Sequence, residues 1–123
     1  MPSKSYELHG VRVLECDANE KQLRNYSEAV ELIGKAFENH ASLIVVPAEC
    51  LDDDFFRLNT RIAGEMIQKV VQYRQRLVIV GDISPHLAES SALRAFVLEA
   101  NRGKEVWFLP TREELDERLA QAV

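Results

Sequence analysis

Two short, uninterrupted apolar runs constrain the fold of this chain more than any other feature. Residues 42–46 read SLIVV and residues 77–80 read LVIV. This composition is typical of strands covered on both faces, because a strand with one face in water alternates apolar and polar side chains. Pro47 ends the first run, and apolar residues at helical spacing predict an amphipathic helix over 62–71. A strand, a helix and a strand in this order predict a parallel crossover unit.

The rest of the chain extends this unit on both sides. His9-Gly10 joins two β-prone runs at the two-residue spacing of a tight hairpin. Residues 48–58 have no clean period, and we expect them to form a loop anchored by the adjacent Phe55 and Phe56. The other expected elements are strands at 6–8, 11–15 and 106–109, helices at 25–39 and 92–100, and a last helix from Thr111 through Leu119. Together they predict a single α/β domain over residues 1–123, with a mixed, mostly parallel sheet in the order β-β-α-β-α-β-α-β-α.

Composition agrees with one domain and excludes several functional classes. The chain has 123 residues, of which 46% are hydrophobic and 28% charged. Its 15 basic and 20 acidic residues give a formal net charge of −5, which offers no cationic footprint for nucleic acid or for an anionic membrane. No apolar run is long enough for a transmembrane helix, and the first residues lack the apolar region of a secretory signal. We therefore expect a cytoplasmic protein with no nucleic-acid or membrane partner.

No segment carries a common catalytic, metal or cofactor motif. The patterns GxGxxG, GxxxxGK[ST], GxSxG and HExxH are missing from the sequence. The histidines are scattered, and the two cysteines are too few for a disulfide framework. The acidic residues in 49–54 could offer oxygen ligands to a divalent ion, but three consecutive aspartates cannot all face one ion, which favours a solvated loop. We expect no metal and no cofactor, and assign no catalytic residue.

Polar residues that follow the predicted strands form the candidate site. In an open parallel sheet, ligands bind beyond the carboxyl ends of the strands, where the following helices begin. Asn59 and Thr60 stand at the start of the helix over 62–71, and Asp82, Ser84 and Ser91 follow the strand at 77–80. Asp82 and Ser84 also fit an ordinary turn, and Asn59 or Thr60 and Ser90 or Ser91 fit ordinary helix caps, each of which contributes about 1 kcal/mol. The polar face of the same helix adds candidates for contact with a partner, namely Arg61, Glu65, Gln68 and Lys69.

Two longer segments carry a resemblance to a known family. Residues 55–84, FFRLNTRIAGEMIQKVVQYRQRLVIVGDIS, and residues 90–108, SSALRAFVLEANRGKEVWF, resemble the bacterial family catalogued as domain of unknown function 4180. Members often have glycine directly after the threonine, where this chain has the bulkier Arg61. The resemblance implies a fold and a set of site residues but no reaction. Its pattern runs through Phe56, Leu58, Thr60, Ala63, Gly64, Glu65, Gln68, Lys69, Tyr73, Gly81, Asp82, Ser84, Ser91, Phe96, Glu99, Asn101 and Gly103.

At the level of fold, the order of elements is similar to that of anti-sigma-factor antagonist domains, the STAS fold. Those domains are small cytoplasmic regulators that bind a partner kinase and are switched by phosphorylation at the start of the second helix. Thr60 lies near that place, although Asn59-Thr60-Arg61-Ile62 stands where those domains have a DSxG-like phosphosite. The similarity implies a regulatory protein without catalysis, by analogy of fold alone.

Two functional hypotheses follow. In the first, a non-catalytic interaction domain contacts a protein partner through the acidic loop and through Asn59, Thr60, Arg61, Glu65, Gln68 and Lys69. In the second, a small-molecule or anion site, with possible catalysis, requires that Thr60, Glu65, Asp82, Ser84, Ser91 and Asn101 converge on one pocket. A homodimer could form through the last helix, with Leu115, Leu119 and Val123, but the two leucines could instead cover the sheet.

Overall fold

The strands form one sheet whose order follows the chain. In the computed structural model, which describes residues 3–17 and 25–122, this five-stranded sheet has the order β1-β2-β3-β4-β5. β1 pairs antiparallel with β2, and the remaining neighbours are parallel, which confirms a mixed, mostly parallel sheet. The strands are β1 (Ser3–Leu8), β2 (Val11–Cys16), β3 (Leu43–Pro47), β4 (Leu77–Val80) and β5 (Val106–Leu109).

The turn residues His9 and Gly10 explain why β1 and β2 form a hairpin. His9 and Gly10 both have positive φ, of 50° and 80°, which a two-residue hairpin turn of the mirror-image type requires. Leu8 and Val11 are then directly opposite each other in the β1–β2 ladder. The hairpin predicted from this spacing is confirmed.

The helices differ from the predicted order in two places. Residues 48–58, predicted as a loop, contain a 3₁₀ turn, η1, and a short helix, α2, and they end where a second 3₁₀ turn, η2, begins; an additional helix, α4, precedes α5. Phe55 and Phe56 explain the first difference: both rings are buried, and a helix can turn two adjacent side chains toward one core, whereas a strand would separate them. Pro85 lies in the first turn of α4, a position that proline favours, and this explains the additional helix. The helices are α1 (Tyr26–Glu38), α2 (Asp53–Phe56), α3 (Ile62–Gln72), α4 (Ser84–Glu89), α5 (Ser91–Arg102) and α6 (Arg112–Ala122), and the 3₁₀ turns are η1 (Ala48–Cys50) and η2 (Leu58–Thr60).

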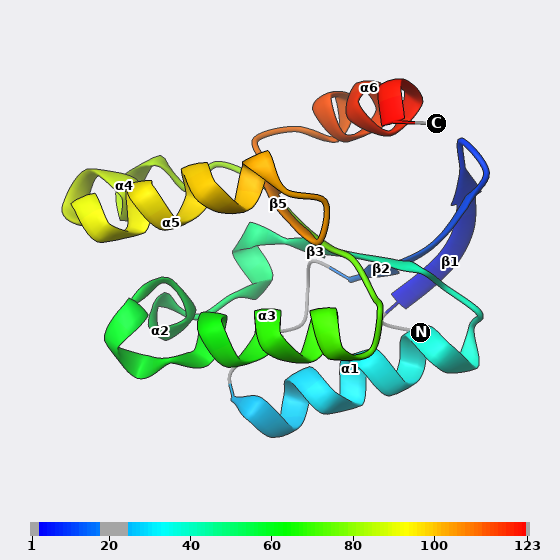
Figure 1. Cartoon of the computed structure of the whole chain (residues 1–123), viewed down its shortest axis with the longest axis horizontal. Coiled ribbons are helices and arrows are strands. Elements are labelled where there is room, and N and C mark those ends of the chain that lie inside the picture. The colour runs from blue at the N-terminus through cyan, green and yellow to red at the C-terminus, as the bar shows by residue number, and fades with distance from the viewer. Residues whose placement is uncertain (1–2, 18–24, 123) are drawn as a thin grey trace.

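Strand order decides which face of the sheet each helix covers. From β2 to β5 each strand lies beside its predecessor, and right-handed crossovers in one direction place their helices on one face. α1, α3 and α5 therefore pack on the face of Leu14, Ile44 and Ile79. α6 follows the last strand and covers the other face, where Leu115 and Leu119 are buried (Figure 1).

Two predictions about individual side chains can be compared with this layering. Trp107 and Phe108 alternate across β5 as expected, since Trp107 packs on the α6 side and Phe108 on the α5 side. Leu115 and Leu119 cover the sheet, which is the alternative that the sequence left open, so they offer no free apolar surface to a second copy. Val123 lies outside the described residues. No helix in the described part of the chain is long and apolar enough to cross a membrane.

The carboxyl ends of β3 and β4 lead directly into the segments that form the candidate site. β3 continues through η1 into α2, and β4 continues through Gly81 into α4. These segments gather beyond one edge of the sheet, at the left of Figure 1, away from the β1–β2 hairpin. The two exits touch, because a Cβ placed on Gly81 would lie 2.8 Å from the Cβ of Ala48.

Candidate functional site

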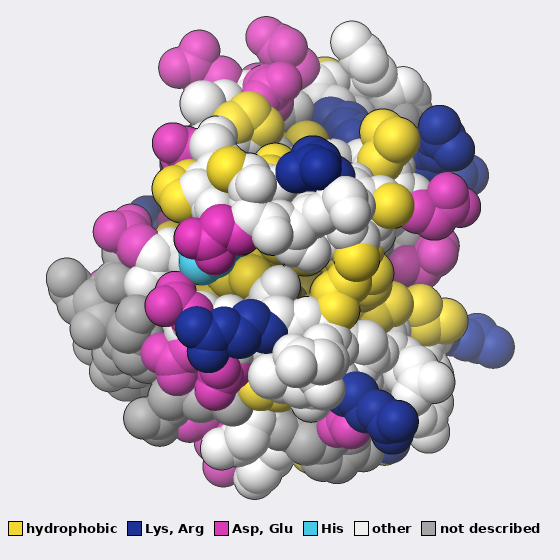
Figure 2. All heavy atoms as spheres, turned by 90° about the vertical axis from the view of Figure 1, so that its left-hand side faces the viewer, with side chains coloured by type: hydrophobic (Ala, Val, Ile, Leu, Met, Phe, Trp, Pro, Cys, Tyr) yellow, Lys and Arg dark blue, Asp and Glu magenta, His cyan; other side chains and the backbone are white. Residues whose placement is uncertain are grey.

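A groove separates two groups of helices at this edge of the sheet. We call it the helix groove; α2, η2 and α3 form one side, and α4 and α5 form the other. It consists of two hollows that share Leu58, with volumes of about 740 and 430 Å³. Figure 2, which faces this side, shows apolar side chains in the depression between two ridges that carry charged residues. The larger hollow is lined by Asp53, Phe56, Arg57, Leu58, Asn59, Pro85, His86, Glu89, Ser90 and Ala92, and the smaller by Leu58, Arg61, Gly64, Glu65, Gln68 and Phe96.

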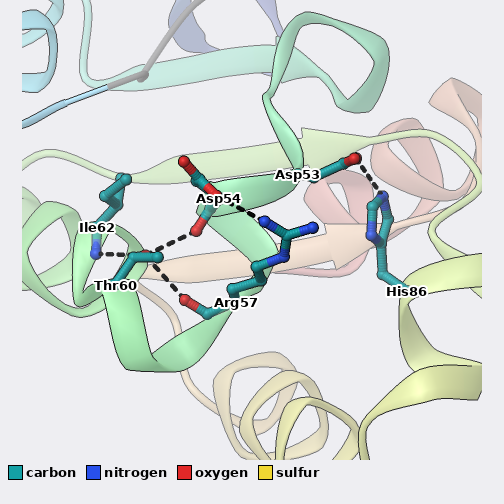
Figure 3. Close-up of polar contacts among 6 residues, drawn as sticks. All are labelled: Asp53, Asp54, Arg57, Thr60, Ile62 and His86. Carbon is teal, nitrogen blue, oxygen red and sulfur yellow. Dashed lines mark hydrogen bonds and ion pairs between the residues drawn. The ribbon is translucent and has the colours of Figure 1, made fainter.

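An aromatic stack joins the two sides of the larger hollow. The rings of Phe56 on α2 and His86 on α4 lie parallel, with centroids 4.2 Å apart and planes at 15°. Phe55 meets Phe56 edge-on at 5.3 Å and is itself buried in the core. The Nε2 of His86 lies 3.9 Å from Oδ1 of Asp53 (Figure 3). The core therefore fixes the position of Phe56, and Phe56 in turn fixes the imidazole of His86 at the mouth of the groove.

Thr60 closes the turn between α2 and α3. Its Oγ1 lies 2.7 Å from the carbonyl oxygen of Asp54 and 2.8 Å from that of Arg57, and its single proton can serve either acceptor. The same oxygen accepts a long hydrogen bond of 3.4 Å from the backbone N–H of Ile62. Arg57 donates from Nη1 to Oδ1 of Asp54 at 3.0 Å, as Figure 3 shows. The hydroxyl of Thr60 is thus engaged with the backbone of the groove wall.

Arg61, and not Asn59 or Thr60, is the residue that caps the start of α3. The prediction that Asn59 or Thr60 is the N-cap residue of this helix was therefore wrong. Arg61 has φ 66° and ψ 4°, in the left-handed region, and its side chain makes no capping hydrogen bond. The 3₁₀ turn η2 ends at Thr60 and α3 begins at Ile62, so the change of direction between them falls on Arg61, whose left-handed backbone makes it.

The predicted site residues divide into two groups. Asn59 lines the larger hollow, and Arg61, Glu65 and Gln68 line the smaller one, so this part of the predicted partner surface is concave. Lys69 lies further along α3, where its Nζ donates to Oε1 of Gln72 at 3.2 Å and stands 5.7 Å from the ring centroid of Tyr73. The residues that line neither hollow are Thr60, Lys69, Asp82, Ser84, Ser91 and Asn101.

Asp82 and Ser84 form a local turn. Oδ1 of Asp82 accepts from the backbone N–H of Ser84 at 2.9 Å and from its hydroxyl at 2.5 Å. These two hydrogen bonds, that of the hydroxyl first, lower the pKa of the Asp82 carboxyl below its ordinary value of 3.8. After α4, Ser90 caps α5 by accepting from the N–H of Leu93 at 3.0 Å, and Ser91 begins that helix. The turn and cap interpretations of Asp82, Ser84 and Ser90 are confirmed.

The turn gives a measurable prediction. In Ser84→Ala the hydroxyl donor is lost while the backbone donor remains, so the pKa of Asp82 should rise part of the way back toward 3.8. A group with a depressed folded-state pKa stabilises the fold above its unfolded pKa, and this contribution disappears as pH falls through the folded value. The part of the stability difference between wild type and Ser84→Ala that comes from the Asp82 carboxyl should therefore vanish below the folded-state pKa of Asp82. Carboxyl-carbon NMR titration of both proteins measures the shift, and an identical Asp82 pKa in both would contradict it.

Asn101 holds α5 against β5, the last strand of the sheet. Its Nδ2 donates to the carbonyl oxygen of Phe108 at 3.1 Å, and its Oδ1 accepts from the N–H of Phe108 at 2.7 Å. Among the strands that the structure describes, β5 pairs only with β4, so one amide side chain satisfies a backbone donor and acceptor that the sheet leaves open. This pairing gives Asn101 a structural role away from the groove.

Sequence reasoning missed several residues of the larger hollow, among them His86 and Glu89. Both follow β4 and lie on α4, and that helix was not predicted. The signal that could have found them is the same sheet-edge rule that pointed to Asp82 and Ser84, applied a few residues further along. Phe56, which was expected to anchor a loop and belongs to the pattern of the family resemblance, lines the larger hollow.

The described residues contain no group of three or more His, Cys, Asp or Glu side chains placed to hold a metal ion. Cys16 and Cys50 are buried, and the thiol of Cys50 donates to the carbonyl oxygen of Asp17 at 3.1 Å. The helix groove therefore offers mixed charges, one imidazole, amide groups and an apolar floor. Such a set of groups can recognise a ligand by shape, hydrogen bonding and charge.

The comparison with known families agrees with the resemblance noted from the sequence. The family described as domain of unknown function DUF4180 matches residues 8–119. The chain belongs to the DUF4180 family. No curated protein and no solved structure matches the chain.

The left-handed backbone at Arg61 predicts that glycine is better suited to this position than arginine. Glycine adopts positive φ without a steric cost, whereas an L-residue with a side chain pays roughly 1–2 kcal/mol. We expect Arg61→Gly to raise the free energy of unfolding by about 1 kcal/mol, after allowing for the greater freedom of glycine in the unfolded chain. Urea denaturation measures this difference. Arg57→Gly, at a residue with φ −91°, is the control and should destabilise; a clear loss of stability in Arg61→Gly would contradict the account.

Proposed function

We propose that this domain is a non-catalytic regulatory module that binds a protein partner through the helix groove. The observation that carries the proposal is the groove itself, a depression formed by two hollows that share Leu58 at the carboxyl ends of β3 and β4. Ligands of open parallel sheets bind at this edge. The groove is also where the predicted partner surface of α3 lies, through Arg61, Glu65 and Gln68.

The distribution of polar and apolar groups supports a protein ligand. Phe56 and Leu58, together with Phe96 of α5, contribute buried or partly buried apolar surface along the groove. Exposed polar and charged side chains, such as Glu65 and Glu89, surround this surface. Protein interfaces have the same anatomy, with an apolar centre that is desolvated and a polar rim that remains wet.

Gly64 supports the approach of another chain to α3. It lies in the middle of the helix and lines the smaller hollow, where a Cβ would meet nothing within 4 Å. Glycine in a helix interior costs about 1 kcal/mol relative to alanine, and no contact within the domain requires it here. The missing side chain widens the groove, which a partner's backbone or side chain can use.

The polar groups of the groove favour binding over catalysis. Nucleophilic catalysis needs a hydroxyl or thiol held beside a base. The hydroxyl of Ser90 caps α5, and the hydroxyl of the neighbouring Thr60 is engaged with backbone carbonyls. The imidazole of His86 has the carboxylate of Asp53 at 3.9 Å but stacks on Phe56, and no such nucleophile is described beside it.

A STAS-like regulatory role would place a phosphorylation switch at Thr60. A phosphate on Oγ1 would remove the proton shared with the carbonyls of Asp54 and Arg57 and add charge beside both side chains, which would rearrange the wall of the groove. Thr60→Asp should then abolish capture of the partner. Thr60→Val, which loses the same hydrogen bonds without adding charge, separates the effect of charge from that of the turn.

The volume of the larger hollow favours one alternative, a small-molecule site. About 740 Å³ lies within the range of small-molecule pockets, roughly 300–1,000 Å³. The polar groups expected for such a site do not support it, because Asp82 and Ser84 bond to each other and Asn101 bonds to the backbone of Phe108. A protein ligand accounts for more of the observed groove.

Two glycines allow a matched test of the proposed function. Gly34 of α1 is also exposed in mid-helix with nothing within 4 Å of a built Cβ, but it lines neither hollow. We expect both Gly64→Gln and Gly34→Gln to fold with equal or higher Tm. In quantitative affinity capture from native lysate, wild type and Gly34→Gln should retain a protein that Gly64→Gln loses. Equal retention by all three baits, or no specifically retained protein, would refute a partner in the groove.

A further inference from the structure

We infer that the helix groove takes an extended peptide segment with a cationic side chain, preferably arginine, in the larger hollow and a large apolar side chain in the smaller one. The inference rests on the proposed function and specifies the chemistry of the partner. It depends on three features of the groove: the balance of charge in the larger hollow, the exposed imidazole between its walls, and the open apolar surface around Gly64.

The larger hollow carries an excess of negative charge. Asp53 belongs to α2 and Glu89 to α4, so a carboxylate stands on each side, and the Asp53 side chain is 75% exposed. The positive charge of Arg57 is matched by Asp54, which bonds it at 3.0 Å and does not line the hollow. A cationic side chain is therefore complementary to this hollow, and an anionic one is repelled.

The stacked imidazole makes arginine a better occupant than a compact cation. Phe56 covers one face of the His86 ring, and 29% of the His86 side chain remains exposed. A planar guanidinium can stack on a ring and donate to carboxylates with its fork of N–H groups. Asp53 and Glu89 provide such acceptors on opposite walls. A lysine ammonium could reach the same acceptors but would not stack as a plane.

The smaller hollow has a different character. Leu58 and Phe96 are partly buried apolar residues, and the absent side chain of Gly64 leaves open space beside them. The charges on its rim, Arg61 and Glu65, are opposite in sign. An apolar side chain can therefore fill this hollow without meeting a net charge. Since the two hollows meet at Leu58, nearby side chains of one extended segment can occupy both.

The experiment uses the full chain labelled with ¹⁵N and a set of short capped peptides. Each peptide contains one arginine and one leucine, separated by zero to three serine or glycine residues; in parallel sets, glutamate or serine replaces the arginine. Titrations followed by NMR measure the affinity and the amides that respond. We expect the arginine set to shift the amides of Phe56, Gly64, His86 and Glu89, and at least one of its members to bind more tightly than its glutamate and serine counterparts.

Charge variants test the assignment of the cation. Asp53→Asn with Glu89→Gln should weaken binding of the best arginine peptide by about tenfold, as expected for two solvent-exposed ion pairs. Glu113→Gln with Glu117→Gln on α6 removes the same net charge on the other side of the sheet and should leave the affinity unchanged. An equal loss in both pairs would show only the effect of net charge and would overturn the assignment.

The outcomes separate this inference from the proposed function. If the glutamate or serine peptides shift the groove amides as strongly as the arginine peptides, the groove binds peptides but the cationic preference is wrong. If no peptide of any set shifts a groove amide, the inference is also wrong, and the capture comparison of Gly64→Gln with Gly34→Gln then decides independently whether a protein occupies the groove.

Discussion

Replacing Phe55 with alanine is expected to lower the free energy of unfolding by about 3–5 kcal/mol, the range typical of a fully buried phenylalanine. The Phe55 ring is 1% exposed, and it belongs to the core on the helix-covered face of the sheet. Its removal leaves a cavity beneath α2 and takes away the edge-on contact with Phe56. Guanidinium denaturation measures the loss.

Phe37 provides the matched control for this substitution. Its side chain is 51% exposed and meets Tyr73 edge-on at 6.1 Å. Phe37→Ala removes the same atoms from a wet surface and should cost less than about 1 kcal/mol. The Phe55→Ala protein should also give altered amide shifts at His86, because Phe56 supports that ring. Similar losses of stability from the two variants would mean that α2 is not anchored as described.

Replacing Gly81 with alanine should cost roughly 2–4 kcal/mol, because two separate effects act against a side chain there. The backbone has φ +146°, which L-residues with a side chain rarely adopt, and the new methyl group would lie 2.8 Å from the Cβ of Ala48. The N–H of Gly81 also donates to the carbonyl oxygen of Leu109 at 2.9 Å, which limits how far the chain can move away. Urea denaturation of Gly81→Ala measures the combined cost.

A second substitution divides the two effects. Adding Ala48→Gly to Gly81→Ala removes the overlapping Cβ but leaves the strained φ, so the double variant should recover only part of the loss after correction for Ala48→Gly alone. Gly103→Ala is the control, since Gly103 has φ −89° and its built Cβ comes no closer than 3.6 Å to another atom; it should be nearly neutral. A neutral Gly81→Ala would mean that the exits of β3 and β4 are not packed together.

Local sequence determined the elements whose hydrogen bonds close within a few residues. Asn25 accepts from the N–H of Glu28 at 3.0 Å, Ser90 accepts from Leu93, and Thr111 accepts from Glu114 at 3.2 Å. Each of these is a capping arrangement with a fixed spacing, which local sequence alone can indicate. The apolar runs of β3 and β4 and the periodic face of α3 likewise report burial directly.

The additional helices and the groove depended on contacts between distant residues. Phe56 and His86 are separated by thirty positions in the numbering, and no local pattern indicates that their rings stack. α2 forms because the core has room for both Phe55 and Phe56 on one side, which only the packing of α3 and α5 decides. Sequence spacing carries no information about the space that other helices leave in the core.

Four of the predicted site residues line the groove and the others do not. The difference depends on tertiary contacts, which the spacing of residues in the sequence does not reveal. Asn59, Arg61, Glu65 and Gln68 line the groove because η2 and α3, with Arg61 between them, form one of its sides. Asn101 instead satisfies the open backbone of Phe108 at the sheet edge. The sequence by itself determined the strands, the long helices and the caps of α1, α5 and α6, because those depend on periodicity and local hydrogen bonds. The tertiary structure alone decided which polar side chains share a concave surface, because that depends on how separate helices pack on one face of the sheet.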